Sequence, residues 1–183
     1  MSKPLNKYYR NLEFDNLDII QEKVLKLLPE NKFGIWNVLM AQFLTIPELY
    51  SNLIKNNLCQ YVNAIQFSVY PMCVHGEYQL SIHTDDTNHT YSLNLPIANC
   101  NNTYVYFYKS DHKPNIKMNP HKHGFYYYLS SDLCEKTDSL EMTTPCIINT
   151  QVLHNIFNSN PLTRIALLLR LNNKFTEEDF NKF

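Results

Sequence analysis

The sequence predicts a mainly β protein, a β-sandwich or jelly roll with N-terminal helices packed on one sheet. The first 60 residues hold two stretches with apolar residues at helical spacing. From Tyr61 onward the chain changes to short segments rich in Val, Ile, Tyr, Phe and Thr. The gaps between these segments are too short for the crossover helices of a parallel α/β fold. The length of 183 residues suits a single domain.

Two helices are predicted in the N-terminal third. An Asp-Asn pair at 15–16 can cap the first helix, and Pro29 ends it. The second begins with the run TIPE, from Thr45 to Glu48, which fits a capping box with Pro in the first turn. Residues 1–60 are therefore expected to form a helical support for the sheets.

Residues 61–171 are expected to form the jelly-roll core, and the polar tail 172–183 to dock loosely or be disordered. Eight strands are predicted in the core, separated by clusters of Asn, Pro and Asp. These strands are Ala64–Tyr70, Tyr78–His83, Tyr91–Ile97, Thr103–Tyr108, Phe125–Leu129, Cys146–Asn149, Val152–Phe157 and Thr163–Leu171.

Composition excludes several classes of protein. The net charge is −1, with 16 basic and 17 acidic residues and no basic stripe, which argues against a nucleic-acid partner. Five cysteines without a C-x-x-C pair indicate reduced thiols rather than disulfides or a zinc ribbon. No signal-peptide core begins the chain, and its longest strongly apolar run, at 165–169, is too short to span a bilayer. We therefore expect a cytoplasmic protein with no membrane contact.

A candidate metal site begins at the run His83-Thr-Asp85, at the end of a predicted strand. Alternate side chains of a strand share a face, so this imidazole and this carboxylate can point the same way. His154, 71 residues further on in another predicted strand, is the natural third ligand. Two histidines and one carboxylate form the facial triad of non-haem iron, which leaves positions open for a bidentate cosubstrate and O₂.

Three further residues are candidates for binding a cosubstrate. Arg164 follows His154 by ten residues, at the start of the last strand, where it could pair with the far carboxylate of a dicarboxylate bound to the metal. Ser92 and Asn94 share one face of their strand and could line the same space. Arg164 could instead form a surface ion pair, and Ser92 and Asn94 could face solvent.

Other histidines offer alternatives. His75 and Glu77 form a second H-x-[DE] pair, but they flank a glycine and indicate a turn. His121 and His123 could begin a second metal site, although no acidic or cysteine companion is close in sequence. His83 is preferred because a strand leads into it. Arg170 shares the face of Arg164 if the last strand is regular, and it could face either the substrate or the cosubstrate.

The segments HTDDTNHTYSLNLPI and INTQVLHNIFNSNPLTRIALLLRL resemble the double-stranded β-helix core of Fe(II)/2-oxoglutarate-dependent oxygenases. They are most similar to the aspartyl/asparaginyl β-hydroxylase branch and to small prolyl-hydroxylase-like proteins, and the resemblance covers about residues 61–171. It implies an enzyme that converts 2-oxoglutarate and O₂ to succinate and CO₂ while hydroxylating a substrate.

The resemblance also implies roles for single residues. His83, Asp85 and His154 match the Fe(II) ligands and Arg164 matches the cosubstrate clamp. Ser92 and Asn94 fall where the β-hydroxylase branch places residues that contact 2-oxoglutarate. The best-known β-hydroxylases lack the carboxylate ligand that Asp85 supplies here.

Three functions are therefore compatible with the sequence. The first is an Fe(II)- and 2-oxoglutarate-dependent dioxygenase that hydroxylates an amino-acid side chain in a protein or a small metabolite. The second is a cupin-like metalloenzyme that uses the same ligands without 2-oxoglutarate. Such an enzyme does not need Arg164 as a clamp for a far carboxylate. The third is a non-catalytic jelly-roll binding module, which predicts no specific affinity for iron.

Overall fold

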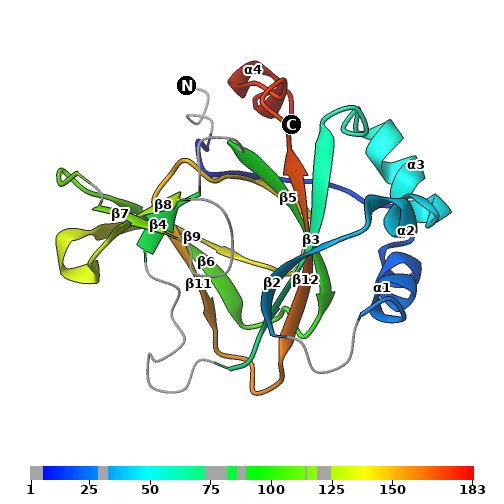
Figure 1. The fold of residues 1–183 in the computed structure, drawn as a ribbon, viewed down its shortest axis with the longest axis horizontal. Helices are drawn as coiled ribbons and strands as arrows, with labels where there is room; N and C mark the ends of the chain where they lie inside the picture. The colour runs from blue at the N-terminus through cyan, green and yellow to red at the C-terminus, as the bar shows by residue number, and fades with distance from the viewer. Residues whose placement is uncertain (1–5, 29–32, 73–81, 86–89, 114, 119–124) are drawn as a thin grey trace, which may run out of the picture.

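The structure is a computed structural model that describes residues 6–28, 33–72, 82–85, 90–113, 115–118 and 125–183. In these ranges the chain is mainly β, with helices concentrated near the N-terminus (Figure 1). The elements are β1 (Tyr9–Asn11), α1 (Leu17–Leu25), β2 (Gly34–Val38), α2 (Met40–Leu44), α3 (Pro47–Lys55), β3 (Val62–Tyr70), β4 (Ile82–Thr84), β5 (Tyr91–Ala98), β6 (Thr103–Lys109), β7 (Asn115–Met118), β8 (Phe125–Leu129), a 3₁₀ turn (Ser131–Leu133), β9 (Glu135–Glu141), β10 (Cys146–Asn149), β11 (His154–Asn158), β12 (Arg164–Leu171) and α4 (Glu177–Phe180).

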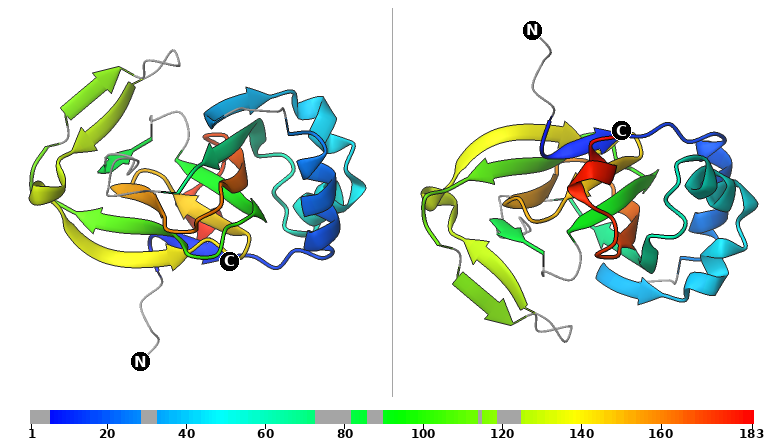
Figure 2. Two further views of the ribbon diagram at one scale, coloured as in Figure 1. Left: turned by 90° about the horizontal axis from the view of Figure 1, so that it is seen from below. Right: turned by 90° about the horizontal axis from the view of Figure 1, so that it is seen from above.

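The strands form two antiparallel sheets. The first has the order β1-β10-β5-β12-β3-β2 and the second has the order β7-β8-β4-β11-β6-β9. Successive strands from β3 to β6, and again from β9 to β12, alternate between the two sheets. Figure 2 shows the sheets as two layers, with α1, α2 and α3 on the outer side of the first sheet.

The main hydrophobic core lies between the first sheet and these helices. Alternate residues of β12, namely Leu167, Leu169 and Leu171, are fully buried in it. Apolar residues of α1, α3 and β5 fill the rest of this core, among them Ile20, Val24, Leu49, Leu53, Leu93 and Leu95. Because side chains alternate along a strand, the intervening residues of β12 and β5 face the second sheet.

All eight predicted strands lie in or overlap observed ones: β3, β4, β5, β6, β8, β10, β11 and β12. Only the part of the predicted second strand from Ile82 onward lies within the described residues. Four strands, β1, β2, β7 and β9, were not predicted, and two of them lie in the region expected to be helical. Sheet pairing forms these strands: β1 pairs with β10, β2 with β3, β7 with β8 and β9 with β6.

The helices differ from the prediction at their ends. The capping box at Thr45 does not form, because a short helix, α2, precedes it and Thr45 is its C-terminal cap, donating from Oγ1 to the Gln42 carbonyl over 2.6 Å. Helix α3 begins at Pro47 with no side-chain cap. Helix α1 begins after Asn16, which has a left-handed φ of 54°. Within the described ranges, no helix has the length and apolar character needed to cross a membrane.

The C-terminal tail is ordered in the structure, unlike the expected loose or disordered segment. Thr176 and Asp179 form a capping box that begins α4. Phe175 and Phe180 are buried, and Phe180 stacks on Tyr91 with ring centroids 4.9 Å apart. Arg10 of β1 lies 4.2 Å from the Phe180 centroid. The tail is polar in overall composition, but its buried aromatic side chains fix it to the first sheet.

Phe180→Ala is expected to lower the free energy of unfolding by about 3 kcal/mol, since it removes a buried ring and leaves a cavity. Phe183→Ala is the matched control, because that ring is 37% exposed, and it should cost under about 1 kcal/mol. Urea unfolding of both variants measures the difference. Equal effects would mean that α4 does not dock as described.

Candidate functional site

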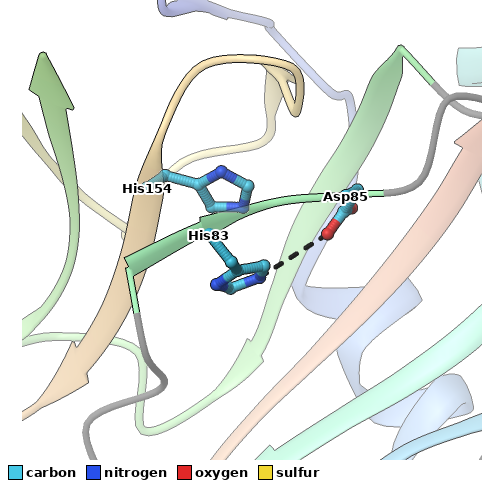
Figure 3. A group of neighbouring side chains, drawn as sticks. All are labelled: His83, Asp85 and His154. Carbon is cyan, nitrogen blue, oxygen red and sulfur yellow. Dashed lines mark ion pairs between the residues drawn. The ribbon is translucent and has the colours of Figure 1, made fainter. Parts of the chain in front are cut away.

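His83, Asp85 and His154 come together between the two sheets (Figure 3). His83 lies in β4 and is the direct antiparallel partner of His154, the first residue of β11. Directly opposed residues of an antiparallel pair have neighbouring Cβ atoms, and here the imidazole centroids are 4.7 Å apart. Asp85 follows β4 by one residue, and its backbone N–H donates to the Thr150 carbonyl over 2.9 Å. The local strand pairing thus brings distant parts of the sequence to one point.

The three side chains each offer one ligand atom, and these atoms all lie within 4.8 Å of one another. Nε2 of His83 is 3.6 Å from Oδ1 of Asp85. Nδ1 of His154 lies 2.8 Å from the Val152 carbonyl oxygen, which can only accept, so Nδ1 carries the proton. The lone pair of His154 is therefore on Nε2, in the tautomer that a metal ligand needs.

The charges at this point also suit a cation. Burial would raise the pKa of Asp85, but Arg170, the hydrogen bond with His83 and the two imidazoles together hold that pKa well below its usual range. Burial, with a smaller contribution from His83, lowers the pKa of His154 to about 4. Near neutral pH the site therefore presents a carboxylate and a neutral imidazole at His154, both competent to bind a metal.

Acidification is expected to destabilise the metal-free protein between about pH 6.5 and pH 4. The pKa of His154 falls from 6.5 to about 4 on folding. In that window the unfolded chain binds a proton at His154 and the folded chain does not, so the free energy of unfolding falls as the pH falls. The full effect is roughly 3 kcal/mol. Urea unfolding of parent and His154→Gln proteins between about pH 7 and about pH 4 measures it. An equal loss in both would contradict the assignment to His154.

The inner face of the first sheet, opposite the three ligand candidates, carries polar side chains. Arg164 is completely buried there, and its Nη1 donates to Oγ of Ser68 over 2.9 Å. Its Nε and Nη2 have no hydrogen-bond partner among the residues that the structure describes. Burial lowers the pKa of this guanidinium, and no described carboxylate pairs with it. An unpaired cation in a protein interior is costly, so this geometry favours an anion at Arg164.

Ser92 and Asn94 lie on the same inner face. In the register of β5 with β12, Ser92 is opposite Arg170 and Asn94 is opposite Leu168. Both are buried, which excludes the alternative that they face solvent. Oγ of Ser92 has no partner within the described ranges, whereas Nδ2 of Asn94 donates to the Ser92 carbonyl over 3.0 Å. No hydrogen bond or ion pair joins Arg164 to the three ligand candidates in the described part of the chain.

Sequence reasoning placed Arg170 on this face but not its contacts, and it missed other members of the face. Arg170 forms an ion pair with Asp85 and donates from Nε to Gln66 over 3.0 Å. Tyr70 is opposite Arg164 in the register, and burial raises its pKa to about 12, with Asp85 contributing and both arginines opposing. The signal was present in β3, where Gln66, Ser68 and Tyr70 alternate with apolar residues.

The alternative metal-binding histidines and their acidic companion lie outside the described residues; these are His75, Glu77, His121 and His123. Of the five cysteines, Cys73 also lies outside them, and the other four are free thiols. Burial raises the pKa of Cys146 to about 12, which makes this thiol a poor nucleophile.

Comparisons with known proteins give no family. No protein-family model matches the sequence, and no curated protein matches it. Among solved structures, a prolyl-4-hydroxylase from Pseudomonas putida aligns with a TM-score of 0.46 and 12% identity, over 91% of this chain and 92% of that one. The capsular polysaccharide assembling protein CapF from Staphylococcus aureus aligns with a TM-score of 0.29 and 13% identity, over 66% of this chain and 27% of that one.

The chain thus spans about a quarter of the CapF chain. Fold and side chains together define a mainly β protein of two antiparallel sheets, with a 2-His-1-carboxylate cluster and a buried arginine between them.

Proposed function

We propose that the chain is an Fe(II)- and 2-oxoglutarate-dependent dioxygenase built on a double-stranded β-helix, or jelly roll. The strand order supports this fold, since β3, β4, β5 and β6 alternate between the sheets, as do β9, β10, β11 and β12. The returning strand β12 lies between β3 and β5, and β11 lies between β4 and β6. Strands of the run β3–β6 thus alternate with strands of the run β9–β12 within each sheet, which is the pattern of a jelly roll.

His83, Asp85 and His154 would hold the iron. Two imidazoles and one carboxylate are the donor set of non-haem Fe(II) oxygenases, and three protein ligands leave positions for other groups. The side chains fit this task, because Asp85 is ionised and His154 presents a lone pair on Nε2. When bound, iron and 2-oxoglutarate would supply the oxidative decarboxylation to succinate and CO₂ that is coupled to hydroxylation of a substrate.

Arg164 is the single observation that carries the proposal. A completely buried guanidinium with two nitrogens that have no partner among the described residues favours an anion of matching geometry, and a carboxylate accepts two parallel hydrogen bonds from such a group. In this proposal one carboxylate of the dicarboxylate pairs with Arg164 and the other end binds at the iron. A cupin-like enzyme that does not use 2-oxoglutarate does not need a clamp for a far carboxylate.

The other residues of the inner face would orient the cosubstrate. Ser92 supplies a buried hydroxyl that no described residue engages, and Tyr70 supplies a phenol that stays protonated at neutral pH because its pKa is raised to about 12. Asn94 can accept a hydrogen bond through its side-chain oxygen. The substrate is proposed to be an amino-acid side chain in a protein or a small metabolite, and the near-neutral net charge of −1 disfavours nucleic acid.

The test is succinate formation by the purified protein. The protein is mixed with Fe(II) and 2-oxoglutarate without O₂, and succinate is measured after O₂ is admitted, beside an Arg164→Met protein. We expect slow formation in the parent, since turnover can proceed without a prime substrate, and none in the variant. Metal binding without any binding of 2-oxoglutarate would support the cupin-like alternative. Failure to bind either would support the binding module.

A further inference from the structure

A chain of hydrogen bonds leads from the candidate metal ligand Asp85 to the edge of the first sheet. Nη1 of Arg170 donates to Oδ2 of Asp85 in a close ion pair. Nε of Arg170 donates to Oε1 of Gln66 over 3.0 Å, and Nε2 of Gln66 donates to Oδ1 of Asn37 over 2.7 Å. The chain crosses three neighbouring strands, β12, β3 and β2.

The two oxygens of Asp85 therefore have different partners. Oδ1 faces the imidazoles and lies 3.6 Å from Nε2 of His83, whereas Oδ2 is held by Arg170. The Asp85 and Arg170 side chains are only 18% and 13% exposed, so water screens this pair little. A guanidinium that donates to two acceptors at once is fixed in its plane, and the second acceptor here is Gln66 on the neighbouring strand β3.

We infer that Arg170, held by Gln66, is a positioning residue that keeps Asp85 as a one-oxygen metal ligand; this inference rests on the proposed metal site. With Oδ2 engaged by Arg170, the carboxylate offers only Oδ1 to the metal. A carboxylate free to bind through both oxygens would take a further coordination position. Arg170 thereby preserves an open position and orients the ligand, which is what hydrogen-bonded outer partners do in metal sites.

The opposite role would be competition. If a metal had to displace Arg170 from Asp85, removal of the guanidinium would tighten metal binding. The two roles therefore differ in the sign of one measured change. Positioning predicts weaker binding in the variant, and competition predicts tighter binding.

The experiment is a Co(II) titration of the purified full chain and of four variants, followed by the visible spectrum of the bound Co(II). Arg170→Met should weaken binding by about 10- to 100-fold. Arg170→Lys should weaken it less, because an ammonium can pair with Asp85 but lacks the planar fork that also engages Gln66. Gln66→Leu should weaken Co(II) binding by about 3- to 10-fold. This is less than the loss expected for a direct hydrogen-bond partner of a metal ligand, because Gln66 acts through Arg170. The Arg170→Met spectrum should change, since the carboxylate can then bind through both oxygens.

Arg10→Met is the matched control. Arg10 is also a buried arginine, but it lies over Phe180 and bonds to Asn181, away from the ligand candidates. It should lower stability and leave Co(II) affinity and spectrum unchanged. Unchanged or tighter binding by Arg170→Met, with binding by the parent intact, would overturn the inference alone. Absence of Co(II) binding by the parent would overturn the proposed metal site, and the inference with it.

Discussion

His154→Ala and Asp85→Ala are expected to abolish tight binding of Fe(II) or Mn(II), with a loss of affinity above about 100-fold. Loss of an outer hydrogen-bond partner alone costs up to that factor, and here a ligand itself is removed. The effect should be this large because the proposed site has only three candidate ligands among the described residues, brought together by one strand pair and one adjoining residue. Calorimetric titration under anaerobic conditions measures it.

His112→Ala is the control for this prediction, because His112 is an exposed histidine outside the cluster. It should bind metal as the parent does. His75→Ala tests the other H-x-[DE] pair of the sequence. If His75→Ala abolished binding while His83→Ala did not, the assignment of the first ligand would be wrong.

Arg164→Met is expected to have two opposite effects. It should abolish binding of 2-oxoglutarate, because the buried guanidinium is the partner proposed for the far carboxylate. It should also raise the free energy of unfolding of the ligand-free protein by about 1–3 kcal/mol, since an unpaired buried charge is replaced by an apolar chain of similar size. The loss of one bond to Ser68 offsets part of this gain.

Urea unfolding and 2-oxoglutarate titration of the same preparations measure both effects. Arg10→Met is again the matched comparison, because this buried arginine donates to two backbone carbonyls and to Asn181 and should lose stability when replaced. A large loss of stability in Arg164→Met would mean that Arg164 serves the fold rather than a ligand.

Much of the fold was predictable because the central strands can be recognised from their local sequence pattern. The segment that forms β12, RIALLLRL, is β-rich and apolar on one face, and its partners β3 and β5 are similar. Strand β9, EKTDSLE, is polar and reads as a loop, and it becomes a strand only by pairing with β6. Strand β1 has three residues and likewise depends on a partner. Pairing across the chain is a tertiary effect that local pattern does not contain.

The candidate site divides in the same way. The spacing of His83 and Asp85 along a strand, and the strand that holds His154, were enough to predict which side chains meet. The contact of Arg170 with Asp85 was not predictable, because it depends on how β4 lies against β12. Gln66 required the register of β3 as well. The local motif therefore predicted the candidate metal ligands. Their hydrogen-bond partners, Arg170 and Gln66, depend on the register of the sheets.

The most direct test of the central claim is a titration of 2-oxoglutarate into the Mn(II)-loaded and the metal-free protein, without O₂. The account predicts binding that requires the metal and is lost in Arg164→Met, because one carboxylate end needs the metal and the other needs Arg164. Equal binding with and without metal, or no binding to a protein shown to hold Mn(II), would contradict it.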